Sequence, residues 1–482
     1  MPITEKLTLV FYLLNIVSAI VVIFLERRNV AATWAWLMVL LFLPGFGFLL
    51  YLVLGQSLRR RRIFKVKEEE IKAIEERVTK QKKQLHKEEI TYNDPESARF
   101  QDMIYMNLSS NYAIYTQDNA VEIYTEGQSK FTSLIQSIEQ AKDHIHLLYY
   151  IVRHDSIGKK ILEALISKAR EGVQVRVLYD HVGSSGLHRD FIKQLKEVGG
   201  EVRAFFPSRI PYVNIRLNYR NHRKLVIIDG THGFIGGFNI GDEYLGLDKH
   251  LGYWRDSHLK ITGSAVHMMQ ARFILDWNLS SPSRIEFPSP AYFPAPQKEG
   301  SIGMQIVTSG PTSEWQSIKN GYLKMIHSAK ESIYIQTPYF IPDDSLLAAL
   351  KISALSGVDV RIMLPSKSDH MMIYWASHSY LGELLASGVR CYLYEKGFLH
   401  AKVMTIDGKV SSIGSANIDI RSFKLNFEIN AFIYDSATTS QLNESFFLDA
   451  INCREVTLDE YDNQPFTSRI KESLARLLSP IL

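Results

Sequence analysis

Residues 222–230, with the sequence HRKLVIIDG, decide the fold, and they recur as HAKVMTIDG at residues 400–408. In each copy a short, mostly apolar run follows the lysine and ends at Asp-Gly, which predicts a buried strand entering a turn. Residues i and i+2 of a strand share a face, so the histidine and lysine of each copy should project into the same space. A glycine-asparagine turn follows both copies, at residues 236–239 (GGFN) and 414–417 (GSAN).

The repeat extends beyond these motifs. Residues 141–147 resemble residues 329–335, and residues 172–178 resemble residues 357–363, each at a predicted helix-to-strand junction. The simplest organisation is two related α/β units, at 116–290 and 305–482, connected by the proline-rich stretch from Pro282 to Pro296. Such a duplication can place two equivalent motifs face to face across a pseudo-twofold axis.

Composition limits the function classes. The chain of 482 residues is long enough for two domains with cores of their own, and its net charge of +4 argues against general nucleic-acid binding. Cys391 and Cys453 are too few for a disulfide framework, and no Cys, His, Asp or Glu group has metal-ligand spacing. We therefore expect a reduced environment and neither metal nor other cofactor.

The N-terminal segment is strongly apolar. Residues 7–25 and 29–58 carry no charged side chain, and each stretch is long enough to cross a bilayer. A secretory signal peptide is disfavoured, because no small-residue cleavage site precedes Glu26 and a second apolar stretch follows at once. We predict a transmembrane helical hairpin over 1–58, which Pro44 and Gly45 could kink or turn back as a re-entrant loop.

A basic segment follows the predicted hairpin. Four consecutive arginines at residues 59–62 should stay on the cytoplasmic side and attract anionic lipid headgroups. The catalytic domains should therefore be cytoplasmic. Within the predicted linker, 59–115, residues 66–90 are rich in lysine and glutamate and form either a solvated helix or a flexible connection.

The paired motifs indicate phosphorus chemistry. A histidine pair can divide the tasks of nucleophile and proton carrier, and Lys224 and Lys402 would supply positive charge for phosphate oxygens. Asn239 and Asn417 would add neutral donors to the substrate. Each imidazole also needs an acceptor for its second nitrogen, and the repeat places Asp256 and Glu428 for this role.

The chain resembles the phospholipase D superfamily, whose signature is a pair of HxKxxxxD motifs with trailing GGxN and GSxN turns. Its finer resemblance is to the bacterial cardiolipin synthases, through residues 26–36, 218–224, 336–343 and 365–370. This resemblance covers nearly the whole chain. It implies two tandem phospholipase D-like domains behind a membrane anchor, in a multi-pass protein of the bacterial cell membrane.

The resemblance also implies a reaction. His222 attacks one phosphatidylglycerol to form a phosphohistidine, and His400 protonates the departing glycerol. His400 then takes a proton from a second phosphatidylglycerol, which attacks to give cardiolipin. Asp229 and Asp407 should order the site rather than transfer protons. Symmetry alone leaves open which histidine is the nucleophile.

Two other function classes stay open at the sequence level. In a phosphodiesterase of the same superfamily, a lipid hydrolase or a nuclease, water would replace the acceptor alcohol; a membrane hairpin is useful to a lipid enzyme and unnecessary for a nuclease. A non-catalytic lipid-binding scaffold would be expected to lose a motif residue, and none is lost. The pairs Tyr149-Tyr150 and Tyr339-Phe340, at predicted strand ends, either line a substrate channel or pack in the core.

Overall fold

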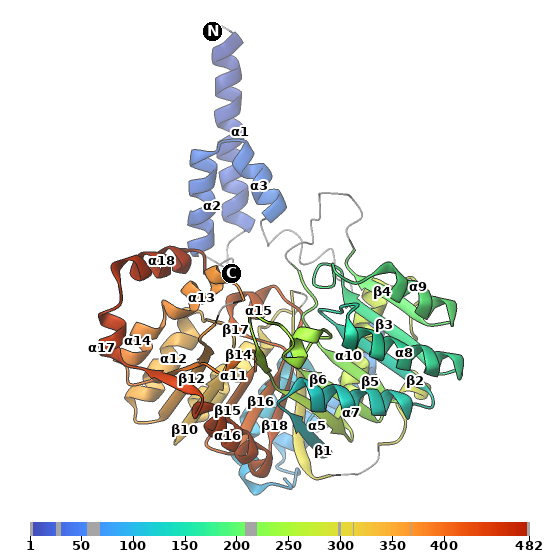
Figure 1. The fold of residues 1–482 in the computed structure, drawn as a ribbon. Helices are drawn as coiled ribbons and strands as arrows, with labels where there is room; N and C mark the ends of the chain where they lie inside the picture. The colour runs from blue at the N-terminus through green and yellow to red at the C-terminus, as the bar shows by residue number, and fades with distance from the viewer. Residues whose placement is uncertain are drawn as a thin grey trace. The chain divides into compact units, whose positions relative to one another are not determined.

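The computed structural model describes residues 3–25, 30–54, 68–207, 219–296, 300–311, 313–367 and 369–479. The chain divides into two compact units (Figure 1), one comprising Met1–Val66 with Ser208–Leu217 and the other Lys67–Pro207 with Asn218–Leu482. The arginine cluster at 59–62 lies outside the described residues.

The described residues of the N-terminal unit form three helices where a two-helix hairpin was expected: α1 (Ile3–Leu25), α2 (Val30–Phe42) and α3 (Phe46–Leu54). The second apolar stretch breaks at Pro44 and Gly45, where glycine adopts a φ of +77°. α3 then packs closely against α2 at Gly47, where a Cβ would lie 2.9 Å from the carbonyl oxygen of Val39. The lack of a side chain at Gly47 permits this close approach. No helix in the described ranges combines the length and apolar character needed to span a membrane.

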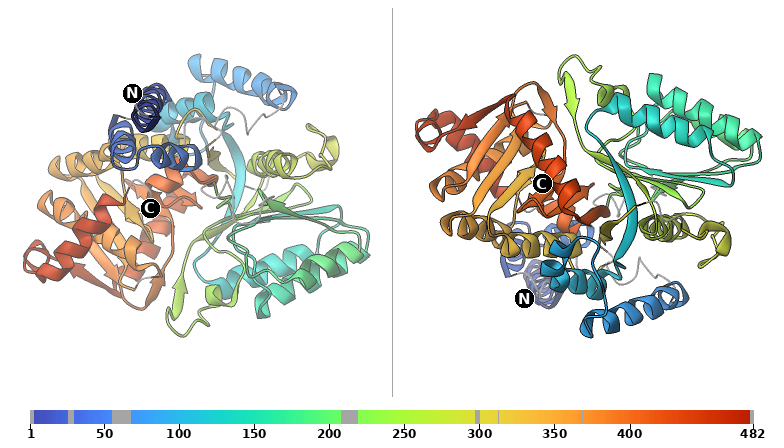
Figure 2. Two further views of the ribbon diagram at one scale, coloured as in Figure 1. Left: turned by 90° about the horizontal axis from the view of Figure 1, so that it is seen from above. Right: turned by 90° about the horizontal axis from the view of Figure 1, so that it is seen from below.

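The larger unit is built on one 15-stranded sheet. From the junction outward the strand order is β1-β8-β6-β5-β2-β3-β4 in the first half and β9-β18-β16-β15-β10-β12-β13 in the second, with β19 added at the second edge. Equivalent strands occupy the same places in the two orders, so that β8 corresponds to β18, β5 to β15 and β2 to β10. At the junction β1 pairs with β9 in antiparallel register. The predicted duplication is therefore visible as a pseudo-twofold repeat of the sheet (Figure 2).

The strands of the first half are β1 (Thr116–Tyr124), β2 (His144–Tyr149), β3 (Gln174–Asp180), β4 (Glu201–Phe205), β5 (Leu225–Ile228), β6 (His232–Gly236) and β8 (His258–Thr262). Those of the second are β9 (Ile302–Ser309), β10 (Ser332–Gln336), β12 (Asp359–Pro365), β13 (Arg390–Tyr394), β15 (Val403–Ile406), β16 (Val410–Gly414), β18 (Glu428–Tyr434) and β19 (Cys453–Val456). Two short parallel pairs stand apart, β7 (Tyr253–Arg255) with β14 (Gly397–Leu399) and β11 (Phe340–Ile341) with β17 (Ile418–Asp419).

Helices cover both faces of each half. In the first half α7 (Gly127–Glu139), α8 (Ser156–Arg170) and α9 (Arg189–Glu197) share a core with Ile145, Leu147 and Tyr149 of β2. The alternate residues of β2 face α10 (Ala265–Ser280), where His146 stacks on Phe273 at 4.4 Å. This alternation follows from the two-residue period of a strand buried on both faces.

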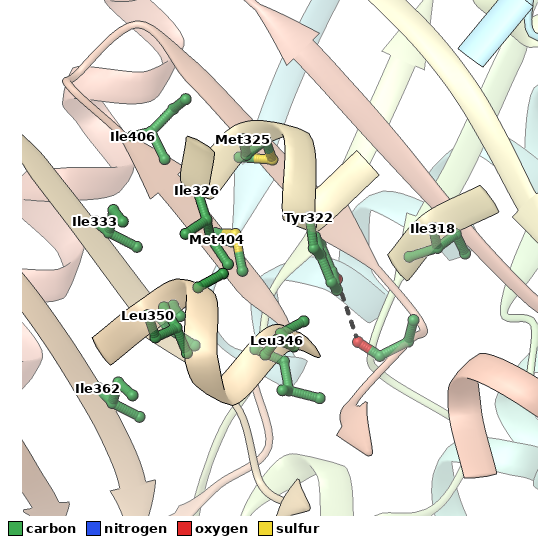
Figure 3. Close-up of a cluster of buried hydrophobic side chains, with 14 of the residues drawn as sticks. Ile318, Tyr322, Met325, Ile326, Ile333, Leu346, Leu350, Ile362, Met404 and Ile406 are labelled. Atoms are coloured by element: carbon green, nitrogen blue, oxygen red, sulfur yellow. Dashed lines mark hydrogen bonds between the residues drawn. The ribbon is translucent and has the colours of Figure 1, made fainter. Parts of the chain in front are cut away.

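The second half carries the same layers and additional helices towards the C-terminus. Its helices are α11 (Ser317–Ser328), α12 (Asp344–Leu355), α13 (Met371–His378), α14 (Leu381–Ala386), α15 (Ile420–Lys424), α16 (Ser436–Ala450), α17 (Leu458–Asp462) and α18 (Phe466–Leu477). Figure 3 shows Met325, Leu346 and Leu350 among side chains at the centre of its core, all fully buried.

Part of the segment expected as a linker belongs to this second core. The charged stretch forms the helix α5 (Glu68–His86), which was one of the two expectations for it. A 3₁₀ turn, η1 (Pro95–Phe100), and α6 (Gln101–Asn111) follow. Met103 and Leu108 of α6 are fully buried in the core of the second half, and Asn107 bonds Gln305 at 3.2 Å.

Candidate active site

The two motifs fold as predicted along the chain. β5 and β15 begin directly after Lys224 and Lys402 and end before Asp229 and Asp407, which take up φ angles of +53° and +51°. An aspartate tolerates this left-handed conformation better than most residues, and the glycine after it completes the turn.

The two motif aspartates bind backbone at the far end of these strands. Asp229 accepts hydrogen bonds from the amides of Lys142, Asp143 and His144, at 2.8–2.9 Å. Asp407 does the same for Lys330, Glu331 and Ser332, at 2.8–3.1 Å. Each carboxylate thus ties the motif strand to the start of β2 or β10. This geometry matches an ordering role.

The motif lysines are buried beside the histidines. Nζ of Lys224 donates to the carbonyl oxygen of His222 at 2.6 Å, and Nζ of Lys402 donates to that of His400 at 2.5 Å. Burial lowers the pKa of Lys224 to about 7, with a further lowering by the charge of Lys402. Burial also lowers the pKa of Lys402 to about 8. Each lysine has two further N–H donors for a ligand.

Each histidine is oriented by a carboxylate from the opposite half. Nδ1 of His222 lies 3.0 Å from Glu428, and Nδ1 of His400 lies 2.6 Å from Asp256. Backbone contacts cross in the same way: the amide of His222 donates to the carbonyl of Phe427 at 3.0 Å, and that of His400 to Arg255 at 2.6 Å. The site is therefore complete only when both halves are present.

The protonation of the pairs follows from burial and charge. Burial lowers the pKa of His222, and burial together with the Lys402 charge lowers that of His400 to about 4. Burial opposes ionisation of Asp256 and Glu428, yet the neighbouring histidine and lysine hold both carboxyl pKa values below their usual range. Neutral imidazoles thus donate Nδ1–H to ionised carboxylates, which leaves Nε2 as a free base and nucleophile.

Both histidines face one cavity of about 760 Å³. The His222 ring lies 4.8 Å from the Tyr150 ring, and the His400 ring lies 5.0 Å from that of Trp254. Of the tyrosine pairs noted in the sequence, Tyr150 and Tyr339 line this cavity, whereas Tyr149 and Phe340 are buried in the two cores.

The two turn asparagines also line the cavity. Oδ1 of Asn239 accepts the amide of Ile151 at 3.1 Å, and its Nδ2 donates to the Tyr244 hydroxyl at 2.9 Å. Nδ2 of Asn417 donates to Asp419 at 3.1 Å, while its Oδ1 is buried without a partner. Each amide keeps a second N–H that is not used in these bonds.

Several cavity residues were not singled out in the sequence. Arg220 and Asn426 lie beside the expected residues His222 and Glu428, but neither has an equivalent in the other copy that would mark it. Arg421 stands four residues after Asn417, where the first copy has Glu243 after Asn239. A comparison of the two copies at this offset would have drawn attention to Arg421. Across the described residues, no three His, Cys, Asp or Glu side chains converge as a metal site.

The fold is similar to that of a solved lipid enzyme. The crystal structure of phosphatidylserine synthase from Haemophilus influenzae matches 79% of this chain and 100% of its own, with a TM-score of 0.61 and 16% sequence identity. At this identity the likeness concerns the fold alone.

Sequence comparison is more specific. The major cardiolipin synthase of Bacillus subtilis is 53% identical over 482 residues, and the cardiolipin synthase of Listeria welshimeri is 50% identical over 483 residues, with full coverage of both chains in each case. Residues 13–56 match the family described as "Phospholipase_D-nuclease N-terminal". Residues 134–277 and 322–449 match the family described as "Cardiolipin synthase, PLD-like domain". The chain therefore belongs to the phospholipase D-like cardiolipin synthase family.

Proposed function

We propose that the chain is a cardiolipin synthase, a phosphatidyltransferase that joins two phosphatidylglycerol molecules and releases glycerol. One observation carries this proposal: two histidines, each oriented by a carboxylate of the other half and flanked by a buried lysine, face a single cavity. The full-length identity of about half to two cardiolipin synthases supports the choice of substrate.

In the first step, Nε2 of His222 attacks the phosphorus of the donor. A new N–P bond forms, and the P–O bond to the headgroup glycerol breaks. His400, as the imidazolium, gives its Nε2 proton to the departing oxygen. Burial and the charge of Lys402 lower its pKa to about 4, and the charge of a bound phosphodiester favours the protonated form that this step requires.

In the second step, neutral His400 removes a proton from the hydroxyl of a second phosphatidylglycerol. That oxygen attacks the phosphohistidine, the N–P bond breaks, and cardiolipin leaves with His222 regenerated. Lys224 and Lys402 stabilise the charge on the five-coordinate phosphorus, and Glu428 and Asp256 hold the tautomers that keep Nε2 free.

The N-terminal unit serves, on this proposal, to attach the enzyme to the bacterial cell membrane with the catalytic halves on the cytoplasmic side. Large apolar side chains on its helices are exposed, including Phe11, Leu14, Leu41 and Phe42. Apolar side chains in contact with water destabilise a protein, whereas a bilayer accommodates them. The arginines at 59–62 would add attraction to the anionic surface where the substrate resides.

The test is a product analysis. The purified full chain is incubated with phosphatidylglycerol in mixed micelles, and the lipid products and free glycerol are separated and quantified. Cardiolipin and glycerol in equal amounts support the transferase. Phosphatidic acid without cardiolipin would assign the site to a hydrolase instead.

A further inference from the structure

The second half-reaction requires the cavity to hold two phosphates at once. On the proposed function, the acceptor phosphatidylglycerol carries its own phosphodiester in addition to the attacking hydroxyl. The lysine pair is committed to the reacting phosphorus. A second anion of this kind in a buried cavity needs its own cationic partners.

Three guanidinium groups line the cavity, those of Arg153, Arg220 and Arg421. Arg153 is already paired with Glu243, at 2.5 Å. Burial lowers the pKa of Arg220; the charge of Asp180 opposes this shift, and the charge of Arg421 adds to it. Within the part of the chain that is described, neither the Arg220 nor the Arg421 guanidinium forms an ion pair or donates a hydrogen bond. Two like charges at one wall repel each other, and an anion between them would remove that cost.

The backbone holds these arginines at the His222 side of the cavity. The amide of Phe427 donates to the carbonyl of Arg220 at 2.8 Å, and the amide of Asn426 donates to that of Arg421 at 3.0 Å. The segment that ends in the orienting residue Glu428 thus contacts both arginines. Their position is fixed relative to the His222–Glu428 pair.

Two unpartnered acceptors lie in the same wall. Asn426 and Asn417 are 6% and 4% exposed, line the cavity, and have no hydrogen bond to Oδ1. Their orientation is set, since Nδ2 of Asn426 donates to Glu428 at 3.2 Å and Nδ2 of Asn417 donates to Asp419 at 3.1 Å. An amide oxygen cannot donate to a phosphate oxygen, but it accepts a hydrogen bond from a hydroxyl group.

The opposite wall lacks these features. At the position matching Arg421 the first half has Glu243, which is paired with Arg153 at 2.5 Å. At the position matching Arg220 the second half has Phe398. The cavity is therefore symmetric at its histidines, but among the described residues its guanidiniums without a hydrogen-bonded carboxylate lie on one side.

We propose that Arg220, Arg421 and Asn426 form the acceptor subsite, in which the guanidiniums bind the acceptor's phosphodiester and the amide oxygen accepts a hydrogen bond from its glycerol. The subsite selects a glycerophosphate headgroup, rather than water or free glycerol, as the nucleophile that attacks the phosphohistidine. Free glycerol carries no phosphate, so its attack on the phosphohistidine does not use the arginines.

The test compares two acceptors on the full chain in mixed micelles. Cardiolipin formation from phosphatidylglycerol is measured beside exchange of labelled free glycerol into phosphatidylglycerol. For Arg421→Gln and Arg220→Gln we expect cardiolipin formation to fall roughly tenfold to hundredfold, with glycerol exchange within about twofold of wild type. Arg153→Gln, which removes an arginine already paired on the opposite wall, is the matched control and should not change the ratio.

Each outcome decides one point. A parallel loss of both reactions in the arginine variants would overturn the subsite, and so would no loss of either. If the wild-type chain exchanged glycerol but made no cardiolipin, the proposed function would fail. For Asn426, an acceptor lipid with propane-1,3-diol in place of glycerol should react slowly with wild type and gain no further penalty from Asn426→Ala; an additional penalty would contradict the hydroxyl contact.

A separate observation concerns the C-terminal helix α18. Its inward face is polar or small: Glu472 and Ala475 are buried, as is Ser479 just after the helix, and Arg476 contacts Glu383 and the carbonyl of Ser379. Its outward face carries five large apolar side chains, those of Phe466, Ile470, Leu474, Leu477 and the C-cap residue Leu478. This is the reverse of the usual pattern for a surface helix.

Cationic residues flank the apolar face, and the surface continues to the cavity. Lys471 lies next to the stripe on one side, with Arg469 on the other. α18 packs against α13, on which Met371 and Met372 are exposed and Ile373 lines the cavity. An apolar face with basic edges has the character of a helix that lies in the surface of an anionic bilayer.

We infer that α18 and the N-terminal end of α13 dock on the anionic bilayer and guide lipid headgroups into the cavity. A fluorescent label on Leu477→Cys in a Cys453→Ser background tests this with the full chain in nanodiscs. We expect quenching by spin-labelled lipids that is greater with phosphatidylglycerol than with phosphatidylcholine alone, and little quenching for a label at the exposed Lys193→Cys of α9. Absence of quenching would overturn the inference. So would label emission typical of an apolar environment that does not change with lipid composition, because protein rather than lipid would then cover this face.

Discussion

The two halves of the larger unit share their strand order and their catalytic motif, but they support the orienting carboxylates differently. β8 pairs with β6 so that His258 faces Gly236, and β18 pairs with β16 so that Asn430 faces Gly414, which fixes the equivalent positions. In the first half a Cβ on Gly237 would lie 1.9 Å from Asp256. In the second half the equivalent Ser415 donates its hydroxyl to Glu428 at 2.5 Å.

The residues behind the carboxylates differ in the same way. In the first half Lys130 is fully buried and donates to the Tyr149 hydroxyl at 2.9 Å, and neither ring nitrogen of His258 has a hydrogen-bond partner. In the second half Ile318 occupies the position of Lys130, and Asn430 bonds Tyr322 and Ser412. The shared reaction thus constrains the cavity side of the repeat, while the packing behind it has diverged.

The largest expected effect comes from the histidines themselves. His222→Ala and His400→Ala should each reduce cardiolipin formation roughly 10⁴-fold or more, and the double variant should cost little more, because the pair acts as one unit. A phosphatidyl ester of p-nitrophenol, whose leaving group needs no proton, separates the roles. With this ester His400→Ala should still release a burst of nitrophenolate and His222→Ala should not; the reverse pattern would exchange the assignments.

The crossed carboxylates should give the next largest effect. Asp256→Asn and Glu428→Gln remove the charge that holds each tautomer and should lower kcat roughly 10²- to 10⁴-fold. Because the pairing crosses between the halves, Asp256→Asn should add little to His400→Ala. Its effect in the presence of His222→Ala should be equally small if both pairs serve one reaction; large additional losses would argue for two independent sites.

Exchanging the turn residues tests the difference between the carboxylates. Gly237→Ser places a side chain where Asp256 stands and should lower kcat roughly a hundredfold by displacing the partner of His400. Ser415→Gly removes one hydrogen bond to a charged group and should lower kcat roughly tenfold. Equal effects of the two substitutions in steady-state assays would show that the halves tolerate the same turn.

Deprotonation of the motif lysines should make kcat/KM fall at high pH. Lys224, with its pKa lowered to about 7, is cationic below that pH, so kcat/KM should fall as pH rises through about 7 and drop roughly tenfold per further unit. In Lys224→Arg, whatever the absolute rate, the fall in kcat/KM should begin at a higher pH, set by the pKa of Lys402 at about 8. A kcat/KM profile that falls at an unchanged pH would remove Lys224 as the source of the fall.

The smallest effect concerns Lys130, the buried lysine behind the carboxylate of the first half. Burial holds the pKa of Lys130 well below its usual value, so the unfolded chain binds its proton more readily and stability is lost as pH falls below about 10.5. Lys130→Met should therefore raise the unfolding temperature at pH 7 by roughly 2–4 °C. The gain should shrink as pH approaches 10 in thermal melts; a gain independent of pH would point to packing alone.

Much of the site could be predicted from the sequence. Residues 225–228 and 403–406 were expected as buried strands and are β5 and β15, because a short apolar run that ends at Asp-Gly has few other stable outcomes. The break at Pro44 was expected only as a possibility, and it produced a third helix. α6 gave no such signal, since its apolar residues find their partners in a core two hundred residues away along the chain.

The sequence by itself determined the duplication, the family and the residue types that carry the chemistry, since these are written in local patterns that repeat. The tertiary structure alone decided that His222 pairs with Glu428 and His400 with Asp256, that Asp229 and Asp407 bind backbone amides, and that Arg220 and Arg421 share one wall. These facts depend on how the two similar halves of one sheet meet, and contacts between distant segments leave no periodicity in the chain.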